Sequence, residues 1–318
     1  MIHELLHLSE EVKAALQSNQ PIVALESSLI SHSMPYPANF ETAKMVEQSI
    51  RNHGAVPATI AIYQGKIHIG IDDTIMRHLA SSDQIIRASR RDLAYVLSQK
   101  ISASTTVSAT MFCAHLAKLP IFVTGGIGGV HHHANESFDI SPDLIELSST
   151  PVTVICSGAK SILDLPKTLE MLETQGVPVI GYQTDEFPAF YSHSSGIPLL
   201  HRLDTVDEVA RLMNYQRKLN LTNGIVIANP IPKNVEIPDD QIRPMIKQAQ
   251  QEVGNIHGKA ITPFLLKRIA ELTAGQSLHA NVELIKNNAI LGAEIAIAYK
   301  KQEIPFLLKT SLFTEKTT

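Results

Sequence analysis

The sequence predicts a three-layer α/β/α fold around a mostly parallel, partly mixed β-sheet, and three observations support this. Short apolar runs alternate with amphipathic stretches along most of the chain, which is typical of α/β proteins. Several runs are apolar throughout, as expected for strands that helices cover on both faces. The pair Gln64-Gly65 separates two adjoining runs and predicts a hairpin, so the sheet also contains antiparallel neighbours.

Eight segments have the length and the apolar character of strands. In chain order they are Pro21–Glu26, Ala58–Tyr63, Lys66–Ile71, Ile85–Ser89, Pro120–Thr124, Pro151–Cys156, Pro178–Tyr182 and Gly224–Ala228. No repeat, low-complexity tract or linker interrupts the pattern, so we expect one domain over residues 1–318. The loop Asn229–Pro238, with three prolines, is the weakest candidate for a boundary.

Helix ends are marked by residues that satisfy unpaired backbone groups. Ser9, followed by two glutamates, predicts one helix start, and Gly54 predicts the end of a helix that begins near Phe40. Ser141-Pro142-Asp143 has the N-cap, first-turn proline and first-turn acid of another helix. Later helices are predicted at Val206–Leu219, which Asp204 or Thr205 opens, and near Asp239–Val253, Thr262–Thr273 and Ala280–Lys300.

The composition excludes several classes of protein. Hydrophobic residues make up 44% of the 318 residues and charged residues 18%, which argues against disorder. The formal net charge of −4 attracts neither nucleic acid nor an anionic membrane, so we expect neither partner. The absence of tryptophan and the 5% aromatic content disfavour binding by stacking on bases.

The cysteines and the N-terminus indicate a cytoplasmic protein. Two cysteines, Cys113 and Cys156, exclude a disulfide framework or a cysteine-based zinc module, and both lie in apolar runs typical of buried reduced thiols. The segment Met1–Lys13 lacks the basic start and apolar centre of a signal peptide. No uncharged apolar run approaches the length of about 18 residues that a membrane span needs.

Ligands of α/β sheets gather beyond the carboxyl ends of the strands, and three unusual segments follow predicted strands there. The first ends in Glu26, after four apolar residues. Burial favours the protonated form of a carboxyl group, which would suit Glu26 to proton transfer. A glutamate that caps a helix or pairs with a buried base is the alternative.

The second segment is Gly125–Gly129, followed by His131-His132-His133. Four glycines in five positions let the backbone turn its N–H groups towards a bound anion. The spacing matches neither the dinucleotide nor the ATP fingerprint. Adjacent histidines rarely converge on one ion, so a single metal-ligating or phosphate-contacting histidine is more plausible than a site built from all three. A solvated loop without a ligand is the alternative.

The third segment places Lys160 in a turn after Gly158, between a strand and a helix. A helix N-terminus and burial would both lower the pKa of a lysine there. A neutral lysine attacks carbonyl carbons to form a Schiff base. A phosphate-binding or surface lysine is the alternative.

Two weaker patterns lie nearby. Asp139 and Asp143 are four residues apart around a helix start and could hold a hard divalent ion through oxygen and water. Ser104–Val107 begins a predicted helix and could present hydroxyl and N–H groups to phosphate. Helix capping explains both patterns equally well.

Taken together, ten ordered segments resemble the pseudouridine-5′-phosphate glycosidase family, over roughly residues 21–299. The segments are Ala24–Ser27 with Ser31–Pro37, Ser89–Leu93, Thr105–Val107, Gly125–His131, Phe138–Ser141, Gly158–Asp164, Gly181–Asp185, Asn229–Pro232, Thr262–Leu266 and Asn287–Ala289. The resemblance implies an indigoidine synthase A-like fold, one catalytic domain per chain, a homotrimer, and one divalent ion per subunit, usually Mn²⁺ with Mg²⁺ as the alternative.

The resemblance also implies an activity and its residues. The family reversibly cleaves the C–C bond between uracil C5 and ribose C1′ of pseudouridine 5′-phosphate, giving uracil and ribose 5-phosphate. By this resemblance Lys160 is the nucleophile, Glu26 the proton donor and Asp139 the metal ligand. The implied substrate-binding residues are Arg87, Thr106, Val107, His131, Ser141, Pro142, Asp143 and Asn288.

The chemistry explains these residue types. A C-glycoside has no heteroatom leaving group, so the usual two-carboxylate mechanism of glycosidases fails. A lysine adduct at C1′ can instead accept the electrons of C–C cleavage while an acid protonates uracil C5. Water then releases the sugar from the imine.

The chain departs from the family pattern at three positions. Arg87 and His133 stand where the family usually has lysine and glycine, and Ser33 replaces another glycine. Arginine is effectively never neutral, so we expect Arg87 to bind substrate phosphate rather than transfer protons. These departures favour one alternative, a related lyase acting on another phosphorylated C-nucleoside or a pigment precursor. A non-catalytic phosphosugar-binding protein is the other, and the retention of Lys160 and Glu26 opposes it.

Overall fold

The computed structural model describes residues 2–32, 34–132, 134–254, 256 and 261–311. Within them, eleven strands form one continuous sheet with a main order of β1-β4-β3-β2-β7-β8-β11-β9-β10, and β5 joins β3 through β6. The strands are β1 (Leu6–Leu8), β2 (Ile22–Glu26), β3 (Val56–Tyr63), β4 (Lys66–Ile69), β5 (Ile86–Ala88), β6 (Ala103–Thr105), β7 (Ile121–Val123), β8 (Thr153–Cys156), β9 (Val179–Tyr182), β10 (His201–Leu203) and β11 (Ile225–Ala228).

The sheet is mixed because of β3. Its pairings with β4 and β6 are antiparallel, and every other strand pairing is parallel. The predicted hairpin between β3 and β4 is confirmed: Gln64 and Gly65 both have positive φ, of 49° and 75°, as a tight two-residue turn requires. All eight predicted strands are present, and the prediction missed three strands of only three residues each, β1, β6 and β10.

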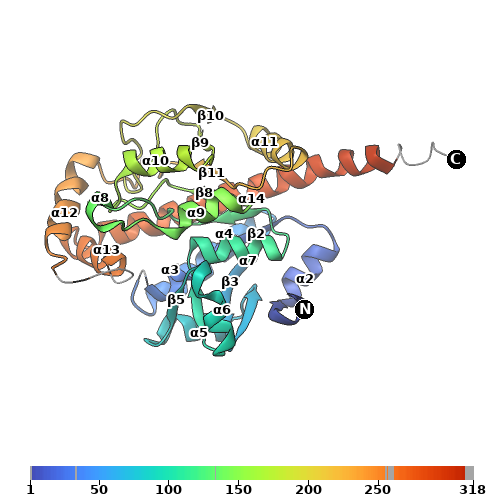
Figure 1. Ribbon diagram of the computed structural model, residues 1–318, viewed down its shortest axis with the longest axis horizontal. Coiled ribbons are helices and arrows are strands. Elements are labelled where there is room, and N and C mark those ends of the chain that lie inside the picture. Colours follow the sequence, from blue (N-terminus) through green and yellow to red (C-terminus); the bar gives the residue numbers. More distant parts are fainter. Residues whose placement is uncertain (1, 33, 133, 255, 257–260, 312–318) are drawn as a thin grey trace.

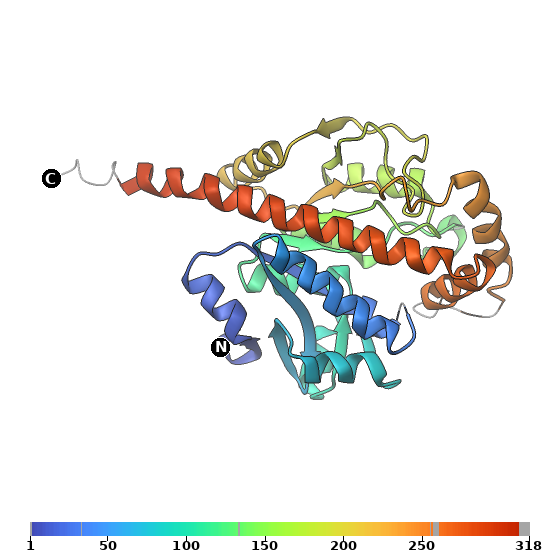
Figure 2. The ribbon, with the colours of Figure 1, turned by 180° about the vertical axis from the view of Figure 1, so that it is seen from behind.

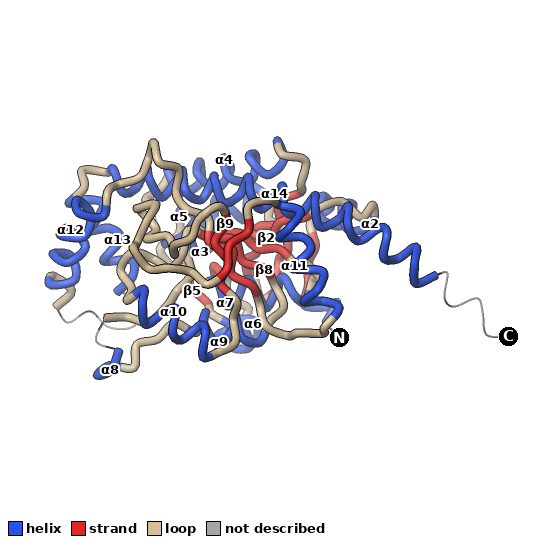
Figure 3. The backbone as a smooth tube through the Cα atoms, turned by 90° about the horizontal axis from the view of Figure 1, so that it is seen from above, coloured by secondary structure: helices blue, strands red, loops and turns tan. Residues whose placement is uncertain are grey.

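Helices cover both faces of the sheet, which confirms the α/β/α prediction. Helices α4 and α14 lie on one side of the strands, and α7, α9 and α10 lie on the other (Figure 3). The helices are α1 (Ile2–Leu5), α2 (Glu10–Gln17), α3 (Ser28–His32), α4 (Ala38–Asn52), α5 (Asp73–Ser81), α6 (Leu93–Ser98), α7 (Val107–Leu116), α8 (Ala134–Ser137), α9 (Pro142–Ser149), α10 (Leu165–Thr174), α11 (Val206–Lys218), α12 (Asp239–Gln251), α13 (Ile261–Leu272) and α14 (Gln276–Ser311), with a 3₁₀ turn at Arg90–Asp92.

The predicted helix caps form. The hydroxyl of Ser9 accepts a hydrogen bond from the Val12 N–H, and the hydroxyl of Ser141 accepts one from the Asp143 N–H. Thr205, rather than Asp204, caps α11. Gly54 follows α4 with a φ of 79°.

Helix α14 is longer than the 21 residues predicted for it, at 36 residues. It packs against α4, α11 and strands β2, β7 and β8, and its last turns extend beyond the body of the protein (Figures 1 and 2). None of the described helices is long and apolar enough to cross a membrane. Cys113 and Cys156 are both buried and free, as predicted, and burial raises the pKa of each thiol to about 12.

Candidate active site

The carboxyl ends of three neighbouring parallel strands bring the main candidate residues together. Leu25 of β2 pairs with Val123 of β7, which in turn pairs with Ile155 of β8. The next residue of each strand therefore lies at the same level of the sheet, so Glu26 is beside Thr124. Lys160 follows four residues after the end of β8.

The Glu26 carboxylate is buried, with only 4% of the residue exposed, and its two oxygens have separate partners. The Thr124 hydroxyl donates to Oε1, and the Ser28 hydroxyl donates to Oε2. A small, mainly apolar cavity of about 30 Å³ adjoins Glu26 on the side of α4 and α14. Both carboxylate oxygens are thus fixed in a site with little water.

Lys160 is 9% exposed and lies among charged groups. Burial lowers the pKa of its amine, and the charge of Glu26 opposes that effect; the positive charge of Arg87 lowers the pKa further. Its backbone is fixed, because its N–H donates to the Ile127 carbonyl at 3.0 Å and its carbonyl accepts from the Leu163 N–H at 3.0 Å. The Gly158 turn that leads to it has a φ of 82°. A desolvated amine within electrostatic reach of a buried carboxylate suits a Schiff-base nucleophile.

In the glycine loop, the N–H groups of Ile127 and Gly128 hydrogen-bond to the protein and are therefore not offered to an anion, whereas an anion cradle built from the other glycine N–H groups stays a prediction. The Ile127 N–H donates to the Gly158 carbonyl, and the Val130 N–H donates to the Thr168 hydroxyl. The glycines also allow close packing: a Cβ on Gly126 would lie 2.7 Å from the Phe190 ring. The loop supports Lys160 as well, because the Ile127 carbonyl accepts a hydrogen bond from the Lys160 N–H.

Asp143 holds the support together. Its carboxylate is buried, and its two oxygens accept hydrogen bonds from the Ser108 N–H and the Gly128 N–H, each at 2.9 Å. It thus connects the first turn of α7 to the glycine loop. A Cβ on Gly128 would lie 2.1 Å from the Ser141 hydroxyl, so this glycine is needed for the close approach of α9.

Four of the predicted substrate-binding residues lie at the starts of α7 and α9. Thr106 caps α7 and Val107 begins it, and both are buried. Ser141 is partly exposed and caps α9, and Pro142 is exposed in its first turn. These four residues therefore place two helix N-termini beside the glycine loop.

Arg87 lies on β5, which joins the sheet through β6 and β3 and so is several strands away from β8 and Lys160. The charge of Arg87 nevertheless affects the pKa of Lys160. Arg87 is half-buried. The pKa of His32 is lowered, mainly by burial and then by the charge of Arg87, which also acts on Lys160. Arg87 therefore adds positive charge to the surroundings of Lys160 and His32.

Asp139, the candidate metal ligand, lies next to His131, one of the candidate substrate-binding residues. The His131 N–H donates to the Asp139 carbonyl at 3.1 Å. Burial lowers the pKa of the His131 ring, and the charge of Asp139 opposes this. No group of three His, Cys, Asp or Glu side chains converges on one point within the described residues. A partly exposed carboxylate with open positions for water fits a hard ion such as Mn²⁺ or Mg²⁺; His133 lies outside the described residues.

Asn288 is fully buried, and its amide hydrogen bonds are made within the protein. Its Nδ2 donates to the Thr124 carbonyl at 3.0 Å and to the Ser157 hydroxyl at 3.1 Å, and its Oδ1 accepts from Asn229 Nδ2 at 2.9 Å. One side chain of α14 thus connects the ends of β7, β8 and β11. This geometry gives Asn288 a positioning role in the structure.

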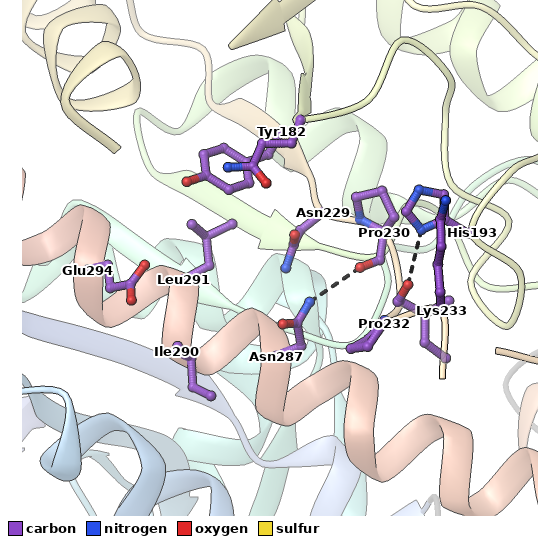
Figure 4. A pocket seen from close by; sticks show the side chains of 12 residues that line it. Tyr182, His193, Asn229, Pro230, Pro232, Lys233, Asn287, Ile290, Leu291 and Glu294 are labelled. Atoms are coloured by element: carbon purple, nitrogen blue, oxygen red, sulfur yellow. Dashed lines mark hydrogen bonds between the residues drawn. The ribbon is translucent and has the colours of Figure 1, made fainter. Parts of the chain in front are cut away.

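A larger pocket of about 380 Å³ lies beyond β9 and β11, against α14. Glu294 and Leu291 lie at one end of it and His193 and Lys233 at the other (Figure 4). Neither Lys160 nor Glu26 lines it. Three segments that carry the family resemblance contribute to its wall: Gly181–Asp185, Asn229–Pro232 and Asn287–Ala289. These three segments therefore line a pocket that is separate from Lys160 and Glu26.

Comparison with known proteins decides the family. The indigoidine synthase A-like family model matches residues 11–298. A pseudouridine-5′-phosphate glycosidase from Legionella pneumophila is 65% identical over all of both chains, and one from Staphylococcus aureus is 54% identical over 94% of this chain and 98% of its own. The chain belongs to the pseudouridine-5′-phosphate glycosidase family.

Two solved structures confirm the family fold. The prealnumycin C-glycosynthase AlnA, in complex with ribulose 5-phosphate, has a TM-score of 0.88 and 35% identity over 95% of this chain and 99% of its own. An indigoidine synthase A-like protein from Thermotoga maritima has a TM-score of 0.86 and 33% identity over 93% and 97%. The predicted indigoidine synthase A-like fold is therefore correct.

Sequence reasoning did not single out four polar residues that contact predicted site residues: Ser28, Thr124, Ser157 and Asn229. Each supports a predicted catalytic or binding residue through a hydrogen bond. Thr124 could have been found, because it directly follows an apolar strand and precedes the glycine loop. Ser157 and Asn229 both contact Asn288, but they lie 131 and 59 positions before it in the chain. No local sequence pattern predicts contacts over such separations.

Proposed function

We propose that this protein reversibly cleaves pseudouridine 5′-phosphate into uracil and ribose 5-phosphate through a covalent adduct on Lys160. The observation that carries the proposal is the burial of Lys160 and Glu26 together at the carboxyl edge of β2, β7 and β8. The family names of relatives with up to 65% identity support the substrate. A buried amine and a buried carboxylate form the minimum set for this C–C cleavage.

The pair can supply the nucleophile and the acid in one proton transfer. The Lys160 ammonium passes a proton to the Glu26 carboxylate, which leaves a neutral amine and a carboxylic acid. The amine nitrogen bonds to C1′ as the C1′–O4′ bond breaks, and the positively charged nitrogen then loses a proton to O4′, which restores its lone pair. The burial that lowers the pKa of Lys160 favours this transfer.

Glu26 then delivers its proton to uracil C5. The electrons of the C1′–C5 bond restore the C5=C6 double bond of uracil, and the nitrogen lone pair forms the C=N bond of the imine. Water adds to the imine carbon and releases ribose 5-phosphate, returning the amine of Lys160. Each bond that breaks has its electron pair and proton accounted for by these two side chains and water.

Substrate binding falls to the residues around the pair. Arg87 would bind the phosphate through its permanent charge, and Thr106 and Val107 would meet the substrate at the start of α7. His131, Ser141, Pro142, Asp143 and Asn288 complete the proposed binding set, in which Asp143 and Asn288 act by holding backbone and strand ends.

The experiment that tests the proposal follows uracil release from pseudouridine 5′-phosphate in the presence of Mn²⁺. Borohydride added with ribose 5-phosphate should trap a mass adduct on the peptide that contains Lys160. Absence of uracil release, or an adduct on another lysine, would overturn the assignment.

We also propose that Asp139, with water, holds one Mn²⁺ or Mg²⁺ ion per subunit. Such an ion would supply positive charge next to the substrate. Titration of the protein with Mn²⁺, followed by electron paramagnetic resonance, should give one site that Asp139→Ala weakens at least tenfold. Unchanged Mn²⁺ binding in that variant would contradict the site.

The protein is further proposed to act as a single catalytic domain in a cytoplasmic homotrimer. Sedimentation equilibrium should give a mass three times that of the 34.8 kDa chain. A monomer or dimer at all concentrations would contradict the trimer.

The second candidate is a lyase or synthase for another phosphorylated C-glycoside. The similarity to AlnA, a C-glycosynthase, and the presence of Arg87 favour it. A panel of aromatic C-nucleoside 5′-phosphates separates the two: the first proposal requires pseudouridine 5′-phosphate to have the highest kcat/KM.

A further inference from the structure

Hydroxyl groups near the active site fall into two kinds according to the acceptor of their hydrogen bonds. The hydroxyls of Ser27 and Thr105 both donate to the Ile60 carbonyl, each at 2.7 Å, so they fix the backbone. The hydroxyls of Thr124 and Ser28 instead donate to the two oxygens of the Glu26 carboxylate. Only the second kind acts directly on a group that the proposed reaction uses.

The strand register explains why Thr124 reaches Glu26. The two residues directly follow the paired residues Leu25 and Val123 on neighbouring parallel strands, so their side chains lie on the same face of the sheet. Ser28 approaches from the start of α3, two residues after Glu26. The two hydroxyls therefore come from different elements and meet the carboxylate from separate sides.

Thr124 is itself held rigidly. Its N–H donates to the Ile155 carbonyl at 3.0 Å, and its carbonyl accepts from Asn288 Nδ2 at 3.0 Å. The Asn288 amide is in turn bound by Ser157 and Asn229. Asn288 of α14 thus holds the backbone of Thr124, and the Thr124 hydroxyl in turn donates to Glu26.

We infer that Thr124 and Ser28 are positioning residues that orient the Glu26 carboxylate towards the Lys160 amine for proton transfer. The inference rests on the proposed function. A hydroxyl that donates to a carboxylate favours its ionised form and restricts its rotation. The carboxylate is thereby held in one orientation while it is ionised, and its carboxyl group is directed at one point when it gives its proton to uracil C5.

The direction of the effect on pH dependence follows from this role. The reactive enzyme has one proton shared between Glu26 and Lys160, and activity falls at acid pH when a second proton binds to the carboxylate. Loss of a hydroxyl that favours the ionised form lets that second proton bind at higher pH. The acidic limb of the pH–rate profile therefore moves upward when Thr124 loses its hydroxyl.

Thr124→Val, which keeps the shape and removes the hydroxyl, is the test variant. We expect kcat to fall about 10- to 100-fold with KM within about twofold, and the acidic limb to move up by about one pH unit. Thr124→Ser restores the donor and should keep kcat within about threefold of the original. Ser28→Ala should move the limb in the same direction, which keeps the inference testable if Thr124→Val does not fold.

Thr110→Val is the matched control. Thr110 is a buried threonine whose hydroxyl donates to the Thr105 hydroxyl at 2.9 Å, away from any carboxylate, so its loss should leave the acidic limb in place. Thr124→Val should still give the borohydride adduct with ribose 5-phosphate, since Lys160 is unchanged.

Two outcomes would overturn the inference: a Thr124→Val profile that superimposes on the original, or a Thr124→Ser variant as impaired as Thr124→Val. Failure of the proposed function is a different result, because the unaltered protein would then release no uracil and form no adduct.

Discussion

The two edges of the sheet differ in where their charged groups lie. At the amino edge a pocket of about 570 Å³ adjoins β7, β8 and α11, and Lys118 and Arg217 of its lining are exposed to solvent. At the carboxyl edge the cavity beside Glu26 is only about 30 Å³, yet Glu26 and Lys160 are both buried.

The difference teaches that the volume of a pocket is a poor guide to chemistry in this fold. Water screens the exposed charges at the amino edge, whereas burial changes the proton affinity of groups at the carboxyl edge. The parallel strands explain the asymmetry, because the segments after β2, β7 and β8 all begin at the same edge. Substitutions at the two edges should therefore differ greatly in effect.

The largest effect is expected for Lys160→Ala. Removal of the nucleophile abolishes the covalent route, so uracil release should fall at least about 10⁴-fold, and the borohydride adduct should disappear. Mass spectrometry of the trapped protein and a uracil assay measure both. Retention of the adduct in this variant would show that another amine is the nucleophile.

Glu26→Gln is expected to cause the second largest loss of activity. The amide keeps the size of the side chain but cannot deliver a proton, so kcat should fall about 10²- to 10⁴-fold. Trapping with ribose 5-phosphate should persist, because the aldehyde form of the free sugar needs no protonation of uracil. A variant with full activity would remove Glu26 from the mechanism.

Arg87→Ala should have the next largest effect. Loss of a charged contact to a bound phosphate costs about 2–4 kcal/mol, equivalent to a 30- to 1,000-fold loss of kcat/KM. Arg87→Lys should retain much of the activity, since it keeps the charge. If the pH–rate profile of Arg87→Lys gains a new limb near neutral pH, this position transfers protons and the phosphate-binding assignment is wrong.

The smallest effect is expected at the amino edge. Lys118→Ala removes an exposed cation from the pocket of about 570 Å³ and should change kcat/KM less than about twofold. Steady-state assays at low and high salt measure this. A loss comparable to that of Arg87→Ala would show that the amino edge also takes part in substrate binding.

Local patterns predicted the elements that build the site. Eight strands, the Gln64-Gly65 hairpin and the Ser9 and Ser141 caps could be read from apolar runs and turn residues, because these depend on neighbours within a few positions. Strands of three residues, such as β6, are too short to show a period. The full length of α14 also went unpredicted.

The glycine loop shows what local patterns leave open. Four glycines are compatible with an anion cradle or with close packing, and the sequence alone does not distinguish them. The close packing at Gly126 and Gly129 depends on Phe190 and Thr168, which lie 64 and 39 residues further along the chain and occupy the space beside these glycines. Asp143 likewise turned out to hold two backbone N–H groups.

The sequence by itself determined the fold class, the family and the presence of Lys160, Glu26 and Asp139 at strand or loop ends, because each is encoded in contiguous residues. Only the tertiary structure decided that Glu26 receives two hydroxyl hydrogen bonds, that Lys160 is desolvated within reach of the charge of Glu26, and that Asn288 secures three strand ends. Burial and hydrogen-bond partners depend on residues far apart in the chain, which meet only once the sheet and both helix layers have packed.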